Sequence, residues 1–486
     1  MTQCNANATL HNASTTETHN GEPSTGKKSV NAIRRSSIEA ERISKRHSLH
    51  VGARTINKVV PCGGQGNVTM AIVTTNRKWF IILTTAAITT FLVMTINSNR
   101  YERVVYEKHS IILVEKELPP RTVDKNWRGL DKKQIDKLSV LGRILYLGEE
   151  PPLPRTEKTF QILMWKYGKT IENRHLKHFG SDRIDPFEHC SVKNCEITYD
   201  DKALESADIV IFHLHRMVNG ELPKTNRSSS QIWAFLTDES PFQTFLGKNS
   251  LINYNGVFNW SMTYRMDSDI PVPYGRTVLR TTPPTQNLTL TKKRDVLVAI
   301  MGSNCGGRNH RWNYVRELQK HIAVDTYGGC GKLKTCPGHF KSNCRDIDDY
   351  MFYLSFENSN CDGYVTEKVW WNAYGKNSIP IVMGASQENY RKLLPPRSYL
   401  NIDDYAHPKD LATYIRYLNS TGKYREYYAW KRDFEVLNEH GYFRSKSYHY
   451  CRVCEALNYN DKKTKVYQDL RNFWNVSKDC HPAWDA

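Results

Sequence analysis

The sequence predicts an α/β protein with two successive strand–helix halves, preceded by one membrane-spanning helix and a stem. From residue 160 onward, short apolar runs alternate with helical patterns, which is typical of parallel sheets connected by helices. A run of eighteen residues without a charge, at 79–96, precedes them. At 486 residues, the chain is long enough for two core-forming domains with additional segments.

Residues 1–78 are predicted to be a disordered cytosolic tail. They are rich in Ser, Thr and Asn, they are poor in aromatic side chains, and they carry eleven Lys or Arg against four Glu. Met70 is an alternative start to Met1.

The run at 79–96 is predicted to be a transmembrane signal anchor, at the short end of the length that spans a bilayer. Arg77 and Lys78 place the N-terminus in the cytosol and the rest of the chain in the lumen. The distance from Met1 argues against a cleaved signal peptide, and short spans fit thin early secretory membranes. A buried helix of a soluble domain is the alternative interpretation.

The segment after the anchor divides into four predicted parts. Residues 97–155 alternate charge runs with prolines, which indicates a luminal stem. Residues 156–290 and 291–445 are the two α/β halves, and residues 446–486 are a C-terminal tail with a Cys-x-x-Cys pair. Expected strands are 160–165, 208–212 and 231–236 in the first half, and 295–304, 322–327, 350–356 and 379–383 in the second. A helix is expected over 311–321.

The net charge of +18 restricts the class of ligand. A basic surface suits nucleic acid or an anionic small molecule. No recognition motif and no basic–aromatic array supports nucleic acid, so that class is excluded. A merely basic solvated surface is equally consistent with the composition.

Cysteine usage fits an oxidising compartment, because ten of the twelve cysteines follow the anchor. Cys190 and Cys195 are close enough to pair with each other. Cys451 and Cys454 are expected to pair with distant cysteines, since no second pair with zinc spacing accompanies them. The disulfide candidates are Cys190, Cys195, Cys305, Cys330, Cys336, Cys344, Cys361, Cys451, Cys454 and Cys480. The luminal glycosylation sequons are Asn226, Asn259, Asn287, Asn419 and Asn475.

The stretch 356–384 carries most of the functional information. An apolar strand runs into a polar turn with Glu357 and Asn358, and Glu367 and Lys368 then open a helix. Polar groups at the junction of a parallel strand and a helix N-terminus commonly bind a phosphate-bearing ligand. An ordinary strand–loop–helix with a solvated Glu–Lys pair is the alternative.

This stretch, FENSNCDGYVTEKVWWNAYGKNSIPIVMG, resembles the donor-site motif of the α1,3-fucosyltransferases (glycosyltransferase family 10). The resemblance covers about residues 160–455. It implies the GT-B fold, two facing Rossmann-like domains, with GDP-fucose as the donor. The donor-binding positions carried over are Ser303, Asn304, Arg311, Tyr353, Asn358, Tyr364, Glu367 and Lys368, and the secondary candidates are Arg308, Tyr264, Arg265 and Glu357.

The sequence FLTDESPF resembles the family's ESP segment, whose glutamate is the proposed general base. That position is Glu239, at the carboxyl end of an expected strand in the first half. Asp238 is the local competitor, and a helix cap or an exposed strand end is the structural alternative. Asp267-Ser268-Asp269 looks like a metal motif, but enzymes with the GT-B fold that the resemblance implies generally do not hold the diphosphate through a metal. This run is therefore expected to be structural or to orient donor-side loops.

The segment after residue 379, together with Cys451-x-x-Cys454, is most similar to the branch that fucosylates the innermost GlcNAc of N-glycans. The resemblance therefore implies a Golgi enzyme with an N-glycoprotein acceptor and no tightly bound cofactor. Mn²⁺ or Mg²⁺ is expected to stimulate activity without being essential. A Lewis-type enzyme acting on terminal N-acetyllactosamine is the first alternative, and an inactive membrane-anchored glycan-binding protein is the second. The oligomeric state is left open.

Overall fold

The computed structural model describes residues 124–154, 158–177, 184–217, 221–224, 227–245, 250–282, 295–333, 344–442, 445–461 and 465–484. The predicted tail and anchor, residues 97–123 of the predicted stem, and Asn226, Asn287 and Cys336 lie outside these ranges. Within the described ranges, no helix is both long enough and apolar enough to cross a membrane.

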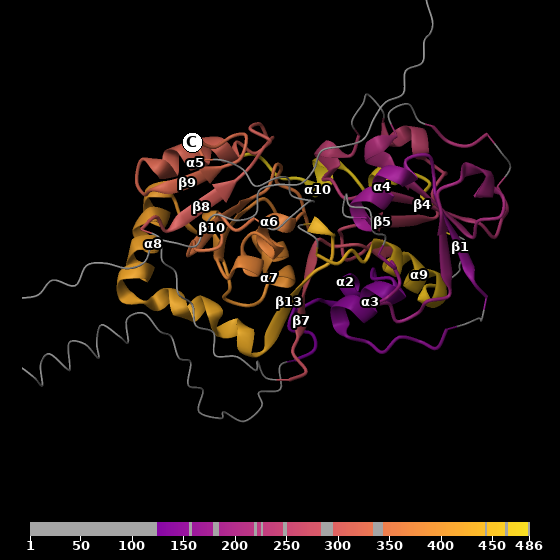
Figure 1. Ribbon diagram of the computed structural model, residues 1–486, viewed down its shortest axis with the longest axis horizontal. Helices are drawn as coiled ribbons and strands as arrows, with labels where there is room; N and C mark the ends of the chain where they lie inside the picture. The colour runs from indigo at the N-terminus through magenta and orange to yellow at the C-terminus, as the bar shows by residue number, and fades with distance from the viewer. Residues whose placement is uncertain are drawn as a thin grey trace, which may run out of the picture. The chain divides into compact units, whose positions relative to one another are not determined.

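The first half contains a six-stranded parallel sheet with strand order β2-β1-β3-β4-β5-β6 (Figure 1). Its strands are β1 Phe160–Met164, β2 Cys195–Thr198, β3 Ile209–His213, β4 Ile232–Thr237, β5 Trp260–Thr263 and β6 Ile270–Pro271. All five residues of β3 are buried. Its first four residues are apolar, and a central strand of this kind is typical of a parallel sheet covered on both faces, as the sequence predicted.

The second half contains a five-stranded parallel sheet with strand order β12-β11-β10-β8-β9. Its strands are β8 Val298–Met301, β9 Val324–Tyr327, β10 Phe352–Phe356, β11 Ile379–Met383 and β12 Leu400–Asn401. Helix α5 (Arg311–Gln319) and helix α8 (Pro408–Thr421) pack together beside this sheet (Figure 1). The expected strands at 322–327, 350–356 and 379–383 are therefore confirmed.

The remaining elements connect and cover the two sheets. An antiparallel ribbon joins β7 (Gly275–Leu279) to β13 (Phe434–Asn438). The other α-helices are α2 Lys132–Ile135, α3 Val140–Leu147, α4 Gly168–His175, α6 Glu367–Trp370, α7 Gln387–Leu393, α9 His449–Tyr459 and α10 Val476–Asp479. The 3₁₀ turns are η1 Asp201–Leu204, η2 Leu214–Arg216, η3 Pro241–Gln243, η4 Leu251–Tyr254, η5 Tyr374–Lys376, η6 Ile402–Asp404, η7 Lys423–Arg432 and η9 Leu470–Asn472.

The structure corrects the predicted stem over about its second half. Helix α3 is capped by Ser139, whose hydroxyl accepts from the backbone N–H of Gly142, and it ends at Gly148 in the left-handed conformation. Leu141 and Leu145 are buried in the core of the first half. Upstream, the buried guanidinium of Arg128 donates to the carbonyls of residues 146, 277 and 392. Charge runs and prolines dominate the composition of the segment 97–155. The composition therefore indicated a stem over its whole length and did not reveal that these apolar side chains are buried.

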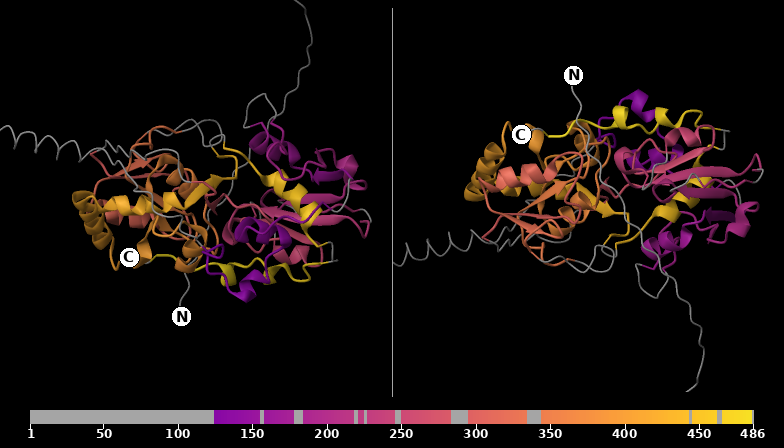
Figure 2. Two further views of the ribbon diagram at one scale, coloured as in Figure 1. Left: turned by 90° about the horizontal axis from the view of Figure 1, so that it is seen from below. Right: turned by 90° about the horizontal axis from the view of Figure 1, so that it is seen from above.

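The C-terminal tail is likewise part of the core of the first half. All eleven residues of α9 are buried, and the helix packs against α3 and β1. In both views of Figure 2, this yellow helix lies against the magenta strands of the first sheet. Because α9 is buried on every side, it is stabilised by contacts all around its surface rather than along one apolar stripe.

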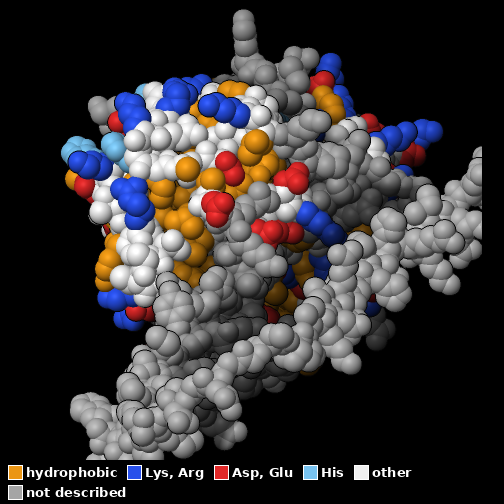
Figure 3. Space-filling view, turned by 60° about the vertical axis from the view of Figure 1, so that its left-hand side comes forward, with side chains coloured by type: hydrophobic (Ala, Val, Ile, Leu, Met, Phe, Trp, Pro, Cys, Tyr) orange, Lys and Arg blue, Asp and Glu red, His pale blue; other side chains and the backbone are white. Residues whose placement is uncertain are grey.

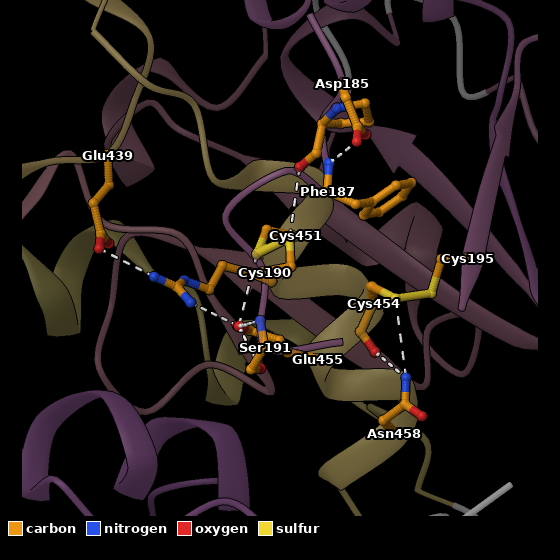
Figure 4. The surroundings of a disulfide bond; sticks show 12 residues. Asp185, Phe187, Cys190, Ser191, Cys195, Glu439, Cys451, Cys454, Glu455 and Asn458 are labelled. Atoms are coloured by element: carbon orange, nitrogen blue, oxygen red, sulfur yellow. Dashed lines mark hydrogen bonds and ion pairs between the residues drawn. A yellow bond between two sulfur atoms is a disulfide. The ribbon is translucent and has the colours of Figure 1, made fainter. Parts of the chain in front are cut away.

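Two disulfides bind α9 to the first half. Cys190 pairs with Cys451, and Cys195 pairs with Cys454 (Figure 4). The expectation that the Cys-x-x-Cys members pair with distant cysteines is confirmed, and the suggestion that Cys190 pairs with Cys195 is wrong. Between the two cysteines of the helix, Arg452 donates to Glu439 and Glu455.

The structure also accounts for five further cysteines, four of them in the second half and Cys480 in the C-terminal tail. Cys305 pairs with Cys330, Cys361 pairs with Cys480, and Cys344 is also disulfide-bonded. On the face drawn in Figure 3, Lys and Arg side chains of the described residues stand among neutral and acidic ones.

Candidate active site

A polar turn between β10 and α6 is folded around the buried carboxylate of Glu357. Glu357 is 1% exposed and accepts from the backbone N–H of Thr366 at 2.8 Å and from the Thr366 hydroxyl at 2.9 Å. Gly384 is needed opposite it, because a Cβ there would lie 2.9 Å from the Glu357 side chain. Burial raises the pKa of Glu357. This carboxylate therefore shapes the turn rather than facing solvent.

Lys368 is the cation of this turn, and it is ion-paired on both sides. Its Nζ lies 3.0 Å from Glu357 and 3.2 Å from Glu367, and it donates to the Thr366 hydroxyl at 2.7 Å. Burial acts to lower the pKa of Lys368, but the two carboxylates outweigh it and raise the pKa. Lys368 is thus held charged and fixed in position, as a preorganised electrostatic group requires.

Arg311, the first residue of α5, lies in electrostatic reach of Lys368 and Glu357. Its guanidinium donates to the carbonyl of Phe356 at 3.0 Å and to the carbonyl of Asn304 at 2.7 Å, while its Nε has no hydrogen-bond partner. Burial lowers the pKa of Arg311. The side chain joins the end of β10 to the loop before α5, and its Nε is a buried donor without a partner among the described residues.

The loop 303–308 lies at the edge of this cluster. Ser303, Asn304 and Arg308 are exposed, and the disulfide Cys305–Cys330 fixes the loop to the segment after β9. The backbone N–H of Arg308 donates to the carbonyl of Asn358 at 2.9 Å, and its guanidinium lies 5.0 Å from the ring of Phe242 in the first half.

Glu239 joins the two halves of the site. It follows β4 in the first half and is partly exposed, and its carboxylate accepts from the hydroxyl of Tyr364 at 3.1 Å. Lys368 also acts on this carboxylate electrostatically. The sequence placed Glu239 in the first half and Tyr364 and Lys368 in the second, and the structure brings the three together.

The pKa of Glu239 is raised. Burial is the largest cause, and the negative charge of Asp238 is the second, while His215, Lys368 and the Tyr364 hydroxyl act in the opposite direction. A carboxylate with a raised pKa is a stronger base for a hydroxyl proton. Its partial exposure leaves the group accessible to a substrate.

Asp238 is not free to serve as the competing base. It is 4% exposed, it is ion-paired with Arg174 at 2.7 Å, and it accepts from His440 at 3.1 Å. Burial acts to raise the pKa of Asp238, but Arg174 and His440 outweigh it and hold the pKa well below its usual range. The geometry therefore favours Glu239 of the two neighbours.

Other residues carried over from the resemblance are placed in the interior. Tyr353 is fully buried, and its hydroxyl accepts from the backbone N–H of Met301 and the side-chain amide of Asn372. Tyr353 thus supports the sheet beneath the site. Tyr264 is buried 5.1 Å from the ring of Tyr364 and supports the residue that contacts Glu239.

Arg265 and the Asp267-Ser268-Asp269 run form a structural network. Arg265 makes two hydrogen bonds to Asp267 and pairs with Asp479 at 3.2 Å. Asp269 accepts from the backbone and hydroxyl of Ser261 and pairs with Lys465. The expectation that this run is structural is confirmed by these contacts.

One predicted glycosylation sequon is contradicted by burial. The side-chain amide of Asn259 donates to the carbonyl of Lys465, and its side-chain oxygen accepts from the backbone N–H of Trp233. This asparagine is 8% exposed and is structural. Asn419 on α8 is exposed, and Asn475 is partly exposed at the N-cap of α10.

Sequence reasoning missed Arg174, His440 and His215 near Glu239. Arg174 and His440 are 64 and 202 positions from Asp238 along the chain, so no local motif connects them. Their only sequence signal is the residue type. In the part of the chain that the structure describes, Asp238, His440 and His449 also place one potential metal-ligand atom each within 4.8 Å of one another.

Two family descriptions match most of the chain after residue 156. "Fucosyltransferase, N-terminal" matches residues 157–275, and "Glycosyltransferase family 10 (fucosyltransferase) C-term" matches residues 291–474. The two matches follow the division into the two sheets, and they contain Glu239 and the turn with Tyr364 and Lys368 respectively.

Several curated proteins are similar over the same region. "Glycoprotein 3-alpha-L-fucosyltransferase A" of Drosophila melanogaster is 36% identical over 299 residues, which cover 60% of this chain and 56% of the fly protein. "Alpha-(1,3)-fucosyltransferase 7" of Rattus norvegicus is 32% identical over 66% of this chain and 82% of the rat protein. "4-galactosyl-N-acetylglucosaminide 3-alpha-L-fucosyltransferase FUT6" of Homo sapiens is 36% identical over 54% of this chain and 71% of the human protein.

A solved structure of α1,3-fucosyltransferase with GDP aligns with a TM-score of 0.38 at 15% identity, over 68% of this chain and 97% of that chain. A second, with GDP-fucose, aligns with a TM-score of 0.38 at 17% identity, over 66% of this chain and 98% of that chain. The two family matches and the extensive similarity to the rat protein decide the assignment. The chain belongs to the fucosyltransferases of glycosyltransferase family 10.

Proposed function

We propose that this fucosyltransferase transfers L-fucose from GDP-β-L-fucose, with inversion, in α1,3 linkage to the innermost GlcNAc of N-glycans. The observation that carries the proposal is the hydrogen bond from Tyr364 to Glu239, which unites a carboxylate of the first half with the cationic turn of the second. The two α/β halves with parallel sheets fit the GT-B arrangement expected of such an enzyme.

The transfer needs one base and one site for the leaving group. Glu239 takes the proton from the O3 hydroxyl of the acceptor GlcNAc as that oxygen attacks C1 of fucose. The bond from C1 to the phosphate oxygen breaks on the opposite face, and GDP departs with the electron pair. General-base help of this kind is worth about 10²–10⁴-fold in rate.

Arg311 and Lys368 supply the positive charge for the diphosphate. Lys368 is fixed by Glu357 and Glu367, and Arg311 has an unpartnered Nε. Cations that are held in place stabilise the charge developing on GDP without reorganising. We infer that this pair replaces a metal, so that Mn²⁺ or Mg²⁺ stimulates the reaction without being essential and no tightly bound cofactor is needed.

The core acceptor is supported by the tail resemblance and by the fly relative, which is named a glycoprotein fucosyltransferase. A Lewis-type acceptor is the second candidate, because the human relative is named for 4-galactosyl-N-acetylglucosaminides. An acceptor panel separates them. Fucose on the Asn-linked GlcNAc supports the first, and fucose only on antennal GlcNAc supports the second.

The catalytic assignment is tested with the full-length protein in membranes. Glu239→Gln should abolish transfer from GDP-fucose and leave GDP binding intact. Glu435→Gln, at a partly exposed glutamate paired with Arg280, is the matched control and should retain activity. Full activity of the Glu239→Gln variant would refute the base. Absence of both transfer and donor hydrolysis in the folded wild-type protein would indicate an inactive glycan-binding protein instead.

We also propose that the enzyme is a single-pass type II Golgi membrane protein with its catalytic part in the lumen. The charge-free run at 79–96, the basic residues before it and the disulfides after it support this topology. Protease treatment of sealed microsomes should leave the catalytic part protected. Digestion of the catalytic part without detergent would contradict the orientation.

A further inference from the structure

Asp238, directly before the proposed base, is held in a network that the proposed reaction does not itself require. Its carboxylate is paired with Arg174 of α4, accepts from His440 after β13, and lies 3.9 Å from His213 of β3. Its backbone carbonyl accepts from the hydroxyl of Tyr274 at 2.7 Å. Side chain and backbone are therefore fixed at once, by elements from distant parts of the chain.

The partners of Asp238 are themselves held by packing. The ring of Tyr274 stacks on His440 with centroids 3.9 Å apart and an angle of 13° between the planes. Arg174 also donates to the hydroxyl of Tyr442 at 3.2 Å. A carboxylate buried this deeply needs a charge partner and hydrogen bonds, and Asp238 has both.

The network ends at the backbone of Glu239. The carbonyl before Glu239 is fixed by Tyr274, and the hydroxyl of Thr237 donates to the carbonyl of Glu239 itself at 3.3 Å. The position of the Glu239 backbone is thus fixed on both sides. The charge of Asp238 acts on the Glu239 carboxylate, because it is the second-largest cause of the raised pKa.

A metal ion is the competing interpretation of the same groups. His440 Nδ1 and His449 Nε2 are buried and have no hydrogen-bond partner among the described residues, and Asp238, His440 and His449 have suitable atom types. Charge balance argues against it. The Oδ2 of Asp238 already accepts from Arg174 and His440, so a divalent ion would enter a buried site beside a guanidinium.

We propose that Arg174, Asp238 and His440 form a positioning network. This network fixes the position of Glu239, and its net charge sets the proton affinity of the Glu239 carboxylate. The proposal rests on the proposed function. Asp238 is a positioning residue, since its side chain is buried among protein groups and Glu239 alone of the pair is partly exposed.

Other charged and titratable groups also face this pair. Those acting on Glu239 are Asp238, His215, Lys368 and Tyr364, and beyond them Arg174, Tyr264, Tyr274 and Tyr442. Those acting on Asp238 include Arg174, His213 and His440, with His175 and His449 behind them. Asp238 and Arg174 carry opposite charges, so removing each should shift the proton affinity of Glu239 in opposite directions.

The test is the pH profile of kcat/KM for fucose transfer by full-length variants, whose acid limb reports ionisation of the base in the free enzyme. Asp238→Asn should move the acid limb to lower pH by about one unit, because a neighbouring negative charge is lost. Arg174→Gln should move it to higher pH. The double variant should return close to the wild-type position, and Arg174→Lys should keep the wild-type profile.

Folding and metal content are controlled separately. Thermal unfolding and GDP binding identify variants that remain folded, and the double variant removes the problem of one uncompensated buried charge. If the wild-type enzyme transfers fucose and neither folded single variant moves the acid limb, the network proposal is overturned and the proposed function stands. Loss of wild-type activity in a chelator, restored by Zn²⁺ in the wild-type protein but not in Asp238→Asn, would overturn it in favour of a metal site.

Discussion

Tyr364 donates a hydrogen bond of 3.1 Å to Glu239 across 125 positions of sequence. One residue belongs to the turn that follows the second half's central strand, and the other follows β4 of the first half. The contact couples the proposed base to the proposed donor site. Several measurable consequences depend on it and on the ion pairs around it.

Tyr364→Phe should reduce kcat and leave the fold intact. The ring still packs against Tyr264, but the hydrogen bond to Glu239 is lost. A hydrogen bond to a charged group is worth about 1.5–3 kcal/mol, so kcat should fall by at least about tenfold. The bond favours the ionised form of Glu239, and its loss should therefore move the acid limb of the kcat/KM profile to higher pH. An unchanged kcat and acid limb would show that the contact is not used in the reaction.

Lys368→Met should affect both stability and donor binding. Glu357 would be left buried without its cation, which costs about 3–5 kcal/mol in the free energy of unfolding. Urea unfolding measures this loss, and steady-state kinetics should show a raised KM for GDP-fucose.

The double variant Lys368→Met/Glu357→Gln separates the two effects. Removing both buried charges should recover part of the lost stability without recovering donor binding. Recovery of the wild-type KM in the double variant would mean that Lys368 has only a structural role.

Four buried histidines should make the protein lose stability as pH falls below about 6.5. Burial lowers the pKa of His175, His213, His440 and His449, that of His213 to about 4. The unfolded chain then binds more protons than the folded chain between about pH 4 and 6.5, so stability rises with pH across this window. Each group contributes up to about 1.4 kcal/mol per pH unit.

Urea unfolding at a series of pH values checks the histidine prediction. Asp238 does not change the stability in this window. Its pKa is depressed in the folded protein, and such a depression affects stability only below the pKa that the group has in the unfolded chain. His213→Asn removes one of the four titrating groups. The slope of the free energy of unfolding against pH should therefore fall by the contribution of that group. A free energy of unfolding that is constant from about pH 5 to 7 would contradict the prediction.

Two of the long-range disulfides should have different effects on activity. Cys361–Cys480 holds the turn just before Tyr364, whereas Cys195–Cys454 holds α9 against β2 in the first half. Replacing either pair by serine should cost about 2–5 kcal/mol in stability. Only loss of Cys361–Cys480 should raise the KM for GDP-fucose several-fold. Equal KM effects from the two double variants would show that the turn does not depend on its disulfide.

The sequence predicted the sheets and the polar turn between β10 and α6 well, because their signals are local. The strand expected at 379–383 is found as β11, and Glu239 lies at the end of a strand as its position indicated. Apolar runs of this kind are buried on both faces of a parallel sheet and need no distant partner to be recognised.

Other features depend on partners far along the chain. In the sequence, the segment of α3 resembles a spacer, and only the structure shows that α9 packs against it. Asn259 likewise has the pattern of a sequon, and only the structure shows that its amide donates to the carbonyl of Lys465. Tyr353 matches a motif position, but it lies within β10, whose residues are all buried, and its side chain is in the core. Local pattern does not record which face of an element is covered, so these positions required the three-dimensional structure.

Product analysis of Glu239→Gln beside the wild-type enzyme tests the central claim most directly. Full-length protein is incubated with GDP-fucose and an N-glycan that has both core and antennal GlcNAc, and the fucose linkage is determined by glycan sequencing. The account predicts fucose on O3 of the Asn-linked GlcNAc with wild-type enzyme and none with the variant, which still binds GDP. Wild-type activity in the variant, or no transfer by folded wild-type protein to any GlcNAc, would contradict it.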